Sequence, residues 1–148
     1  MKANRVYRIL TYAGALPFVA CAVLPFAGIT ELGPFGDWSR VIVTYGLAIT
    51  SFIAGTHWAF ELARPGTYAI SLFVISNVVV LAVWVAALVA PVEIALGVQL
   101  IAFLVMIRVD KAVAQSGGTP EGYLATRQRI TFVVMLALAV AIAATWLT

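Results

Sequence analysis

The chain carries little charge, one cysteine and one histidine, and each scarcity excludes a class of function. Asp, Glu, Lys and Arg make up 10% of the 148 residues, whereas about a quarter of a soluble globular protein is charged. Cys21 cannot form an internal disulfide, and one thiol without further ligands is a poor metal site. Because His57 is the only histidine, one chain cannot ligate a haem through two histidines. No run of Lys and Arg forms a basic stripe, so we expect no nucleic-acid partner.

The sequence also lacks the motifs that carry catalysis. No nucleophile–base pair, phosphate-binding loop or pair of carboxylates is present. We therefore expect no catalytic residue and no metal site, and the sequence requires no cofactor. An enzyme is the less favoured alternative, because its catalytic groups would have to come from the few polar residues inside apolar segments.

Apolar residues, at 64% of the chain, are what the sequence has in excess. Such a chain cannot cover itself with polar surface, so its expected solvent is the lipid bilayer. A helix needs about 20 mostly apolar residues to cross the hydrocarbon core. Five segments approach that length: residues 6–27, 39–60, 67–89, 92–109 and 128–147. We predict an all-α integral membrane protein, a bundle of five transmembrane helices in a single domain over residues 1–148, with the first helix interrupted at Pro17.

The distribution of basic residues predicts the orientation of the bundle. Cytoplasmic connections of membrane proteins collect Lys and Arg. With five crossings, eight of the nine basic residues fall on one side: Lys2, Arg5, Arg8, Arg64, Arg108, Lys111, Arg127 and Arg129. The other side holds only Arg40. We therefore predict the N-terminus inside and the C-terminus outside, in a bacterial inner (cytoplasmic) membrane.

The second apolar segment is rich in small residues. Small side chains at helical spacing let the backbones of neighbouring helices approach closely. We expect Gly46, Ser51 and Gly55 to pack against other helices, and we expect Gly55→Leu to be the most damaging change to folding. In the alternative interpretation, a ligand lies against the grooves that these residues leave.

Four polar residues are expected to meet at the cytoplasmic end. His57 and Glu61 are four apart, so both can face the same way. An arginine near a helix N-terminus opposes the helix dipole, so Arg127 needs an anionic partner. That partner is Asp110, or Glu61 as the second choice, or a lipid phosphate in the alternative interpretation. The candidate ligand-binding residues are His57, Trp58, Glu61, Asp110, Arg127 and Tyr45.

Two amides lie near the middle of the predicted membrane segments. Asn77 belongs to the third segment and Gln99 to the fourth. We expect each to form a hydrogen bond between helices, which contributes about 0.5 to 2 kcal/mol. Alternatively, they hold the carbonyl of a buried apolar ligand.

Several of these residues recur in a known family. The motifs are Gly14-Ala15-Leu16-Pro17-Phe18, Tyr45-Gly46 with Ile49, Ser51-Phe52, Gly55 and His57-Trp58, and Asp110 followed by Tyr123, Arg127, Arg129 and Thr131. In these the chain resembles the family named domain of unknown function 3429, which includes the mitochondrial transmembrane protein 69. It departs from the pattern after Trp58, where Ala59-Phe60-Glu61 follow. The resemblance implies an inner membrane and a setting among respiratory complexes, but no activity.

Three functions compete for this sequence. The first, which we favour, is a non-catalytic accessory or assembly protein that contacts a respiratory or other energy-transducing membrane complex as its partner. The second is a quinone- or phospholipid-binding protein that holds the head group near His57. The third is a small transporter or proton-conducting protein that uses His57, Glu61 and Asp110. It is the weakest, because no acidic residue lies near the membrane centre and no inverted repeat is visible.

Overall fold

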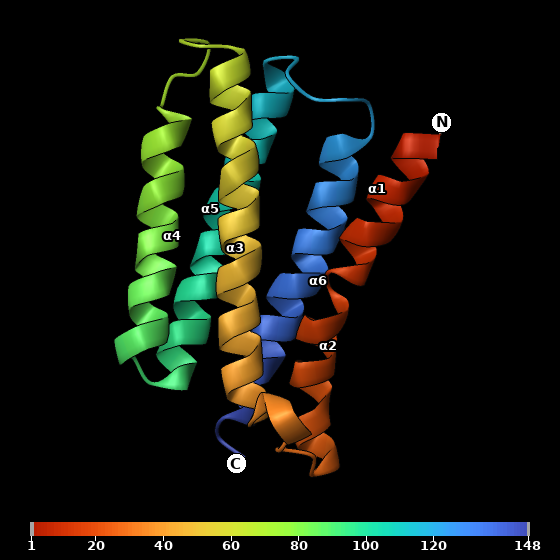
Figure 1. Ribbon diagram of the computed structural model, residues 1–148, viewed down its shortest axis with the longest axis vertical. Coiled ribbons are helices and arrows are strands. Elements are labelled where there is room, and N and C mark those ends of the chain that lie inside the picture. Colours follow the sequence, from red (N-terminus) through yellow and green to blue (C-terminus); the bar gives the residue numbers. More distant parts are fainter. Residues whose placement is uncertain (1, 148) are drawn as a thin grey trace.

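The structure is a bundle of helices that run roughly along one long axis (Figure 1). This computed structural model describes the backbone of residues 2–147 and the side chains of residues 5–147, so the Lys2 side chain used in the orientation prediction lies outside the described residues. The helices are α1 (Lys2–Ala13), α2 (Leu16–Val23), α3 (Trp38–Ala63), α4 (Leu72–Val89), α5 (Val92–Gln115) and α6 (Tyr123–Ala144), with short 3-10 turns η1 (Leu24–Ala27) and η2 (Gly33–Phe35). The two ends of the chain lie at opposite ends of the bundle.

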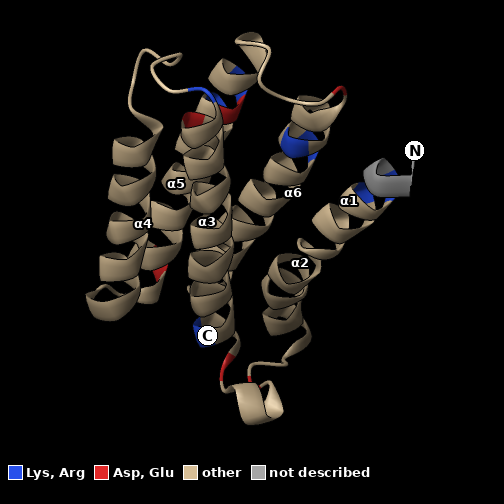
Figure 2. Cartoon of the chain, turned by 45° about the horizontal axis from the view of Figure 1, so that its top comes forward, with Lys and Arg blue, Asp and Glu red and all other residues tan. Residues whose placement is uncertain are grey.

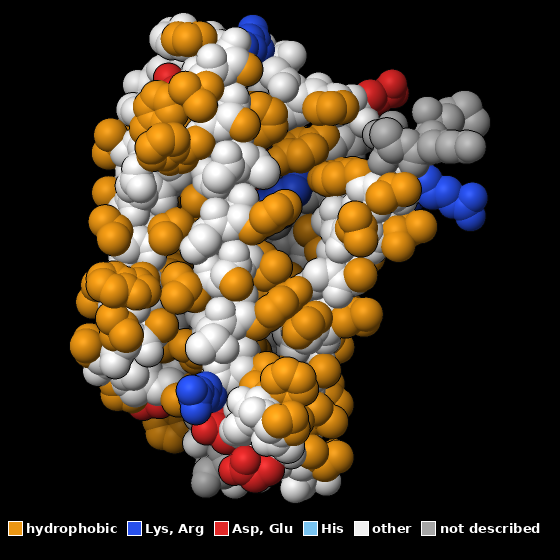
Figure 3. Space-filling model, viewed as in Figure 1, with side chains coloured by type: hydrophobic (Ala, Val, Ile, Leu, Met, Phe, Trp, Pro, Cys, Tyr) orange, Lys and Arg blue, Asp and Glu red, His pale blue; other side chains and the backbone are white. Residues whose placement is uncertain are grey.

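The predicted fold class is confirmed: five helical segments are long and apolar enough to cross a membrane, with α1, α2 and η1 together forming the first. Apolar side chains also cover the outside of the bundle between its charged ends (Figure 3). Phe132 is 69% exposed and Leu88 63% exposed. A monomeric soluble protein rarely exposes apolar surface this continuously. The chain therefore has the features of a multi-pass membrane protein.

The first span is broken, as predicted from Pro17, and the break lies just before this proline. Proline has no N–H to donate to the carbonyl four residues earlier, and its ring crowds that carbonyl. The helix consequently ends at Ala13 and resumes at Leu16. The Tyr45 hydroxyl of α3 donates to the Gly14 carbonyl over 2.9 Å and holds the break against the bundle. α1 thus leans away from the axis of α2 (Figure 1).

Several predicted helix bounds are wrong at the basic end of the bundle, where α3 also ends at Ala63 and not at residue 60. α5 continues through Gln115 instead of ending at residue 109, and α6 begins at Tyr123 instead of residue 128. Charged residues end the apolar stretch, but they do not end the helix, whose backbone hydrogen bonds continue until Gly117 adopts a left-handed φ of 76°. α4 begins at Leu72, later than the predicted residue 67, and is the shortest unbroken span.

α3 packs against α2, α4 and α5. Gly46 is buried against α5, where an added Cβ would lie 2.0 Å from Oε1 of Gln99. Nε2 of Gln99 donates to the Val43 carbonyl of α3 over 2.7 Å, so the predicted bond between helices is present. The prediction for Asn77 is wrong, because its amide donates to the Phe73 carbonyl of its own helix and its side chain is exposed.

The packing prediction is also wrong for Ser51 and Gly55 within this chain. Both residues are exposed, and a Cβ on Gly55 would meet nothing within 4 Å among the described residues. The reason is the phase of the helix. The buried face of α3 runs through Gly46, Thr50 and Ala54, whereas Ser51 and Gly55 follow a different row of the same helix.

Candidate functional site

A buried ion pair joins α5 to α6 near the basic end of the bundle. Nε of Arg127 lies 2.8 Å from Oδ2 of Asp110, which is fully buried. The other carboxylate oxygen, Oδ1, lies 2.9 Å from Nε2 of His57 on α3. The Tyr123 hydroxyl is 3.5 Å from the same oxygen. The structure thus brings together three of the four residues of the predicted cluster, and it contains the predicted Asp110–Arg127 pair.

Glu61, the fourth predicted member, has a separate partner. Its Oε2 accepts a hydrogen bond from the backbone N–H of Leu72 over 2.8 Å. That N–H belongs to the first turn of α4, where a helix has donors without partners of their own. Ser71, at the N-cap position, supplies no side-chain hydrogen bond. Glu61 therefore caps α4 and is not a second anion for Arg127.

Trp58 and Tyr45 also lie apart from the ion pair. Trp58 is 42% exposed and packs edge-on against Phe73 of α4, with ring centroids 4.8 Å apart. Tyr45 precedes His57 by twelve residues, which is about 18 Å along a helix. Its hydroxyl is used by the break in the first span. Neither residue contacts Arg127 through a hydrogen bond or ring contact among the described side chains.

An apolar cleft opens beside Arg127, between α1 and α2 on one side and α3 on the other, with α6 at its floor. In the space-filling view it is the hollow at the middle of the molecule, with a basic side chain visible deep inside (Figure 3). The cleft has a volume of about 160 Å³, whereas one water needs about 10–15 Å³. Arg127 is the only basic residue that lines this cleft among the side chains of residues 5–147. The other predicted ligand-binding residues do not line it.

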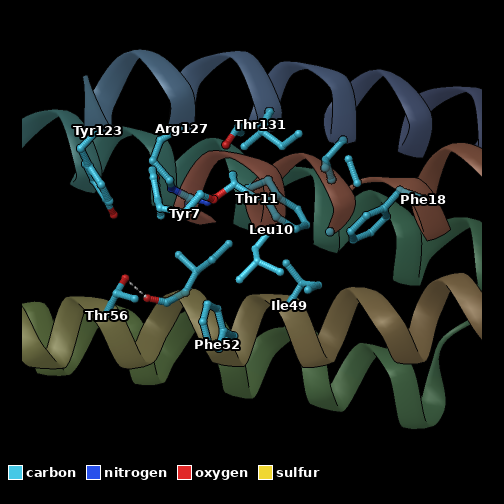
Figure 4. Close-up of a pocket in the computed structure, with 16 residues that line it drawn as sticks. Tyr7, Leu10, Thr11, Phe18, Ile49, Phe52, Thr56, Tyr123, Arg127 and Thr131 are labelled. Atoms are coloured by element: carbon cyan, nitrogen blue, oxygen red, sulfur yellow. Dashed lines mark hydrogen bonds between the residues drawn. The ribbon is translucent and has the colours of Figure 1, made fainter. Parts of the chain in front are cut away.

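Three polar atoms that line the cleft are buried and have no hydrogen-bond partner in the described part of the chain. They are the Tyr7 hydroxyl, Nη2 of Arg127 and the Thr131 hydroxyl. Figure 4 shows Arg127 and Thr131 on α6 beside Tyr7 and Thr11 of α1, across the cleft from Phe52 and Thr56 of α3. Most buried polar groups in proteins find a partner. Three such atoms around one cleft indicate that something polar belongs there.

The Thr131 hydroxyl differs from most other helical hydroxyls among the described residues. Thr11, Thr50 and Ser76 each donate to a carbonyl one turn back in their own helix. Thr131 is only 3% exposed and makes no such bond. A threonine hydroxyl ordinarily takes this local bond when nothing better is offered. The hydroxyl of Thr131 is therefore available to a group in the cleft.

The positive charge at the polar floor of the cleft is balanced inside the bundle. The charge of the Arg127 guanidinium is offset by the buried Asp110 carboxylate, which accepts a hydrogen bond from Nε. Nη2 of Arg127 is left free to donate. An anion next to Nη2 would also lie near the Asp110 carboxylate. This arrangement suits an uncharged acceptor, such as a carbonyl oxygen, better than a phosphate.

Tyr7 and Thr131 were not among the candidate ligand-binding residues, although the sequence held a signal for Thr131. It follows Arg127 by four residues, and Tyr123 precedes Arg127 by four, so the three share one face of a helix. Tyr7 gave no comparable signal. It reaches the cleft because the break at residues 14–15 sets the direction of α1, and its ring stacks on Tyr123 with centroids 6.0 Å apart.

The fold and the site define a small helical protein of the multi-pass membrane class, with a buried ion pair beside an apolar cleft. The chain belongs to the family described as "Protein of unknown function (DUF3429)", whose pattern matches residues 3–143. The resemblance seen in the sequence motifs is thereby confirmed at the level of the family. No curated protein and no solved structure matches the chain.

Proposed function

We propose that the protein binds a membrane-soluble ligand in the cleft, one with an apolar body and a head group that accepts hydrogen bonds. The observation that carries this proposal is the set of unpartnered polar atoms of Tyr7, Arg127 and Thr131 around one apolar cleft. Leaving a buried donor unsatisfied costs about 1–3 kcal/mol. A ligand whose oxygens accept from these donors recovers that free energy.

The proposed head-group site lies at Arg127 and Thr131, away from His57. His57 and Asp110 are buried behind Arg127 and do not line the cleft. Their role in this proposal is to hold the guanidinium in place, so that Nη2 faces the ligand. Phe18 and Val134, farther along the cleft, supply apolar surface for the ligand's body. A quinone and a phospholipid both combine carbonyl acceptors with a long apolar chain.

Two substitutions at Thr131 test the proposal. Thr131→Val keeps the shape of the side chain and removes the hydroxyl, whereas Thr131→Ser keeps the hydroxyl and removes the methyl group. The full chain is extracted from its own membrane in a mild detergent and weighed by native mass spectrometry. We expect a small retained mass on the wild type and on Thr131→Ser. Occupancy in Thr131→Val should fall by about tenfold, the effect of one hydrogen bond.

A second variant addresses the apolar part of the cleft. Ile49→Trp adds bulk to the α3 wall and should displace the ligand without touching the polar atoms. Ser76→Ala, a buried hydroxyl on α4 that does not line the cleft, is the matched control. A bound mass that survives both Thr131→Val and Ile49→Trp would exclude the cleft as the ligand site.

We also infer that the basic end of the bundle faces the cytoplasm of a bacterial inner membrane. Lys and Arg gather at the end that carries the N-terminus (Figure 2). Cys21 is 2% exposed and should be slow to react, so a new cysteine can report its side. A membrane-impermeant maleimide applied to intact spheroplasts should label Phe35→Cys and leave Glu121→Cys, which is exposed at the basic end, unlabelled. The reverse pattern would invert the assignment.

A second candidate function, an accessory or assembly subunit of an energy-transducing membrane complex, is favoured by the outer face of α3. Ser51 and Gly55 are small and exposed. A side chain added at Gly55 would meet no other described residue within 4 Å. Small residues on a lipid-facing surface allow another helix to approach closely. Gly55→Leu should then release a partner on a native gel while leaving the melting temperature of the isolated chain unchanged. A variant that still migrates with the partner would argue against this face.

A further inference from the structure

A second hollow lies next to the cleft at the basic end of the bundle. Tyr7 and Tyr123, which line the cleft, also line this hollow, so the two spaces share a wall. Arg8 of α1 and Arg129 of α6 lie along it, together with Glu121. Both arginines are exposed, and neither forms an ion pair with any side chain that the structure describes. We call this space the basic hollow.

Charge separates the basic hollow from the cleft. The charge of Arg127 in the cleft is offset by Asp110 at 2.8 Å. The basic hollow has two arginines against one carboxylate, which leaves an excess positive charge. An anionic group is therefore expected in the hollow and an uncharged acceptor in the cleft. The excess charge lies at the end of the membrane span, where long arginine side chains extend toward the headgroup region.

The two adjoining spaces together present three kinds of surface. The basic hollow has the guanidinium groups of Arg8 and Arg129, and the cleft has both the hydrogen-bond donors of Tyr7, Arg127 and Thr131 and an apolar wall at Phe18. A glycerophospholipid has a group for each of these surfaces: a phosphate, ester carbonyls, and acyl chains. A quinone has the carbonyls and the apolar chain but no anionic group for the hollow.

We propose that the ligand of this protein is an anionic glycerophospholipid. Its phosphate is bound by Arg8 and Arg129, an ester carbonyl accepts from Arg127 and Thr131, and an acyl chain lies in the cleft. This inference rests on the proposed function and adds the chemical class of the ligand. Arginine is suited to the phosphate because its planar guanidinium donates to two oxygens at once.

The test compares two double variants with the same change in charge. Arg8→Gln/Arg129→Gln removes both guanidinium groups of the basic hollow, and Arg5→Gln/Lys111→Gln removes two exposed charges that line neither space. Each full-length protein is stripped of lipid in detergent and titrated with phosphatidylglycerol, and binding is read by native mass spectrometry. We expect the first variant to bind phosphatidylglycerol at least about tenfold more weakly than the wild type. The second variant should bind it as the wild type does. The two single variants, Arg8→Gln and Arg129→Gln, give the intermediate values if the double variant folds poorly.

Further probes separate failure of this inference from failure of the proposed function. Diacylglycerol with the same acyl chains lacks the phosphate, and we expect it to bind the wild type about tenfold more weakly than phosphatidylglycerol. Equal binding of the two would overturn the phosphate site. Decylubiquinone gives a second comparison. If it binds the wild type and Arg8→Gln/Arg129→Gln equally well but does not bind Thr131→Val, the cleft is the ligand site and the ligand is a quinone, not a phospholipid. Phosphatidylglycerol binding that Thr131→Val does not change would overturn the cleft itself.

Discussion

The carboxylate of Asp110 lies 2.8 Å from Nε of Arg127, and this ion pair joins α5 to α6 in the interior of the bundle. Removing one partner of a buried pair leaves the other charge without compensation, which costs about 3–5 kcal/mol. We expect Asp110→Asn to lower the free energy of unfolding by that amount. Thermal or denaturant unfolding of the purified protein in detergent measures it.

A double variant distinguishes the loss of the pair from the loss of packing. Asp110→Leu/Arg127→Met replaces both charges by apolar groups and leaves neither uncompensated. It should be more stable than Asp110→Asn, although His57 loses its partner as well. If the double variant is the less stable of the two, the uncompensated guanidinium is not the source of the loss.

The contact of Gly46 with Gln99 gives a second prediction. An added Cβ at Gly46 would lie 2.0 Å from Oε1 of Gln99, so the amide must move and give up its bond to Val43. We expect Gly46→Ala to destabilise the protein by about 1–3 kcal/mol, the usual cost of overpacking. Gly97→Ala on α5, where a Cβ meets nothing within 4 Å, is the matched control. Rescue of Gly46→Ala by Gln99→Ala would identify the clash as the cause.

The capping bond between Glu61 and Leu72 gives a third prediction. Glu61→Ala leaves the buried Leu72 N–H without an acceptor, and the expected loss is about 1–3 kcal/mol. Glu61→Gln keeps an acceptor oxygen and loses only the favourable charge at the N-terminus of α4, about 0.3–1 kcal/mol. Hydrogen exchange at the first turn of α4 should accelerate in the alanine variant more than in the glutamine variant. Equal exchange in both would show that the side-chain oxygen is not the acceptor.

Asp37, in the connection before α3, gives a fourth prediction, which concerns pH. The Ser39 hydroxyl and the Arg40 backbone N–H both donate to its carboxylate and hold the pKa of Asp37 below its usual value of 3.8. A lowered pKa in the folded state means that the charged form stabilises α3 above pH 3.8. This contribution is lost as the pH falls through the lowered pKa.

The matched variants are Asp37→Asn and Asp37→Ala. Asparagine is also a good N-cap residue but does not titrate. In the Asp37→Asn variant, the contribution of residue 37 to the stability of α3 should therefore not change in this acid range. Alanine should cost about 1 kcal/mol at neutral pH. Melting temperatures of the wild type and both variants between pH 3 and 7 check this. An Asp37→Asn protein that loses stability in acid as steeply as the wild type would assign the effect to other groups.

Much of the fold followed from the sequence, because crossing a bilayer demands long apolar segments whatever their neighbours are. The five spans were predicted on that basis, and the break in the first span was predicted from Pro17. Helix ends were predicted poorly where charged residues end the apolar pattern, because the backbone hydrogen bonds continue past them. In α5 they continue to Gln115. Packing on α3 was predicted poorly because, in lipid, a small residue can lie on the buried face like Gly46 or on the outer face like Gly55.

The sequence by itself determined the class of protein and the number of spans, and it indicated that Arg127 needs an anion nearby. Only the structure decided that this anion is Asp110 and not Glu61. Only the tertiary structure decided which polar atoms are left over. Nη2 of Arg127, the Thr131 hydroxyl and the Tyr7 hydroxyl lack partners among the described residues because of how α1, α3 and α6 approach one another. Satisfaction of a hydrogen-bonding group depends on three-dimensional neighbours, and residue type alone does not specify them.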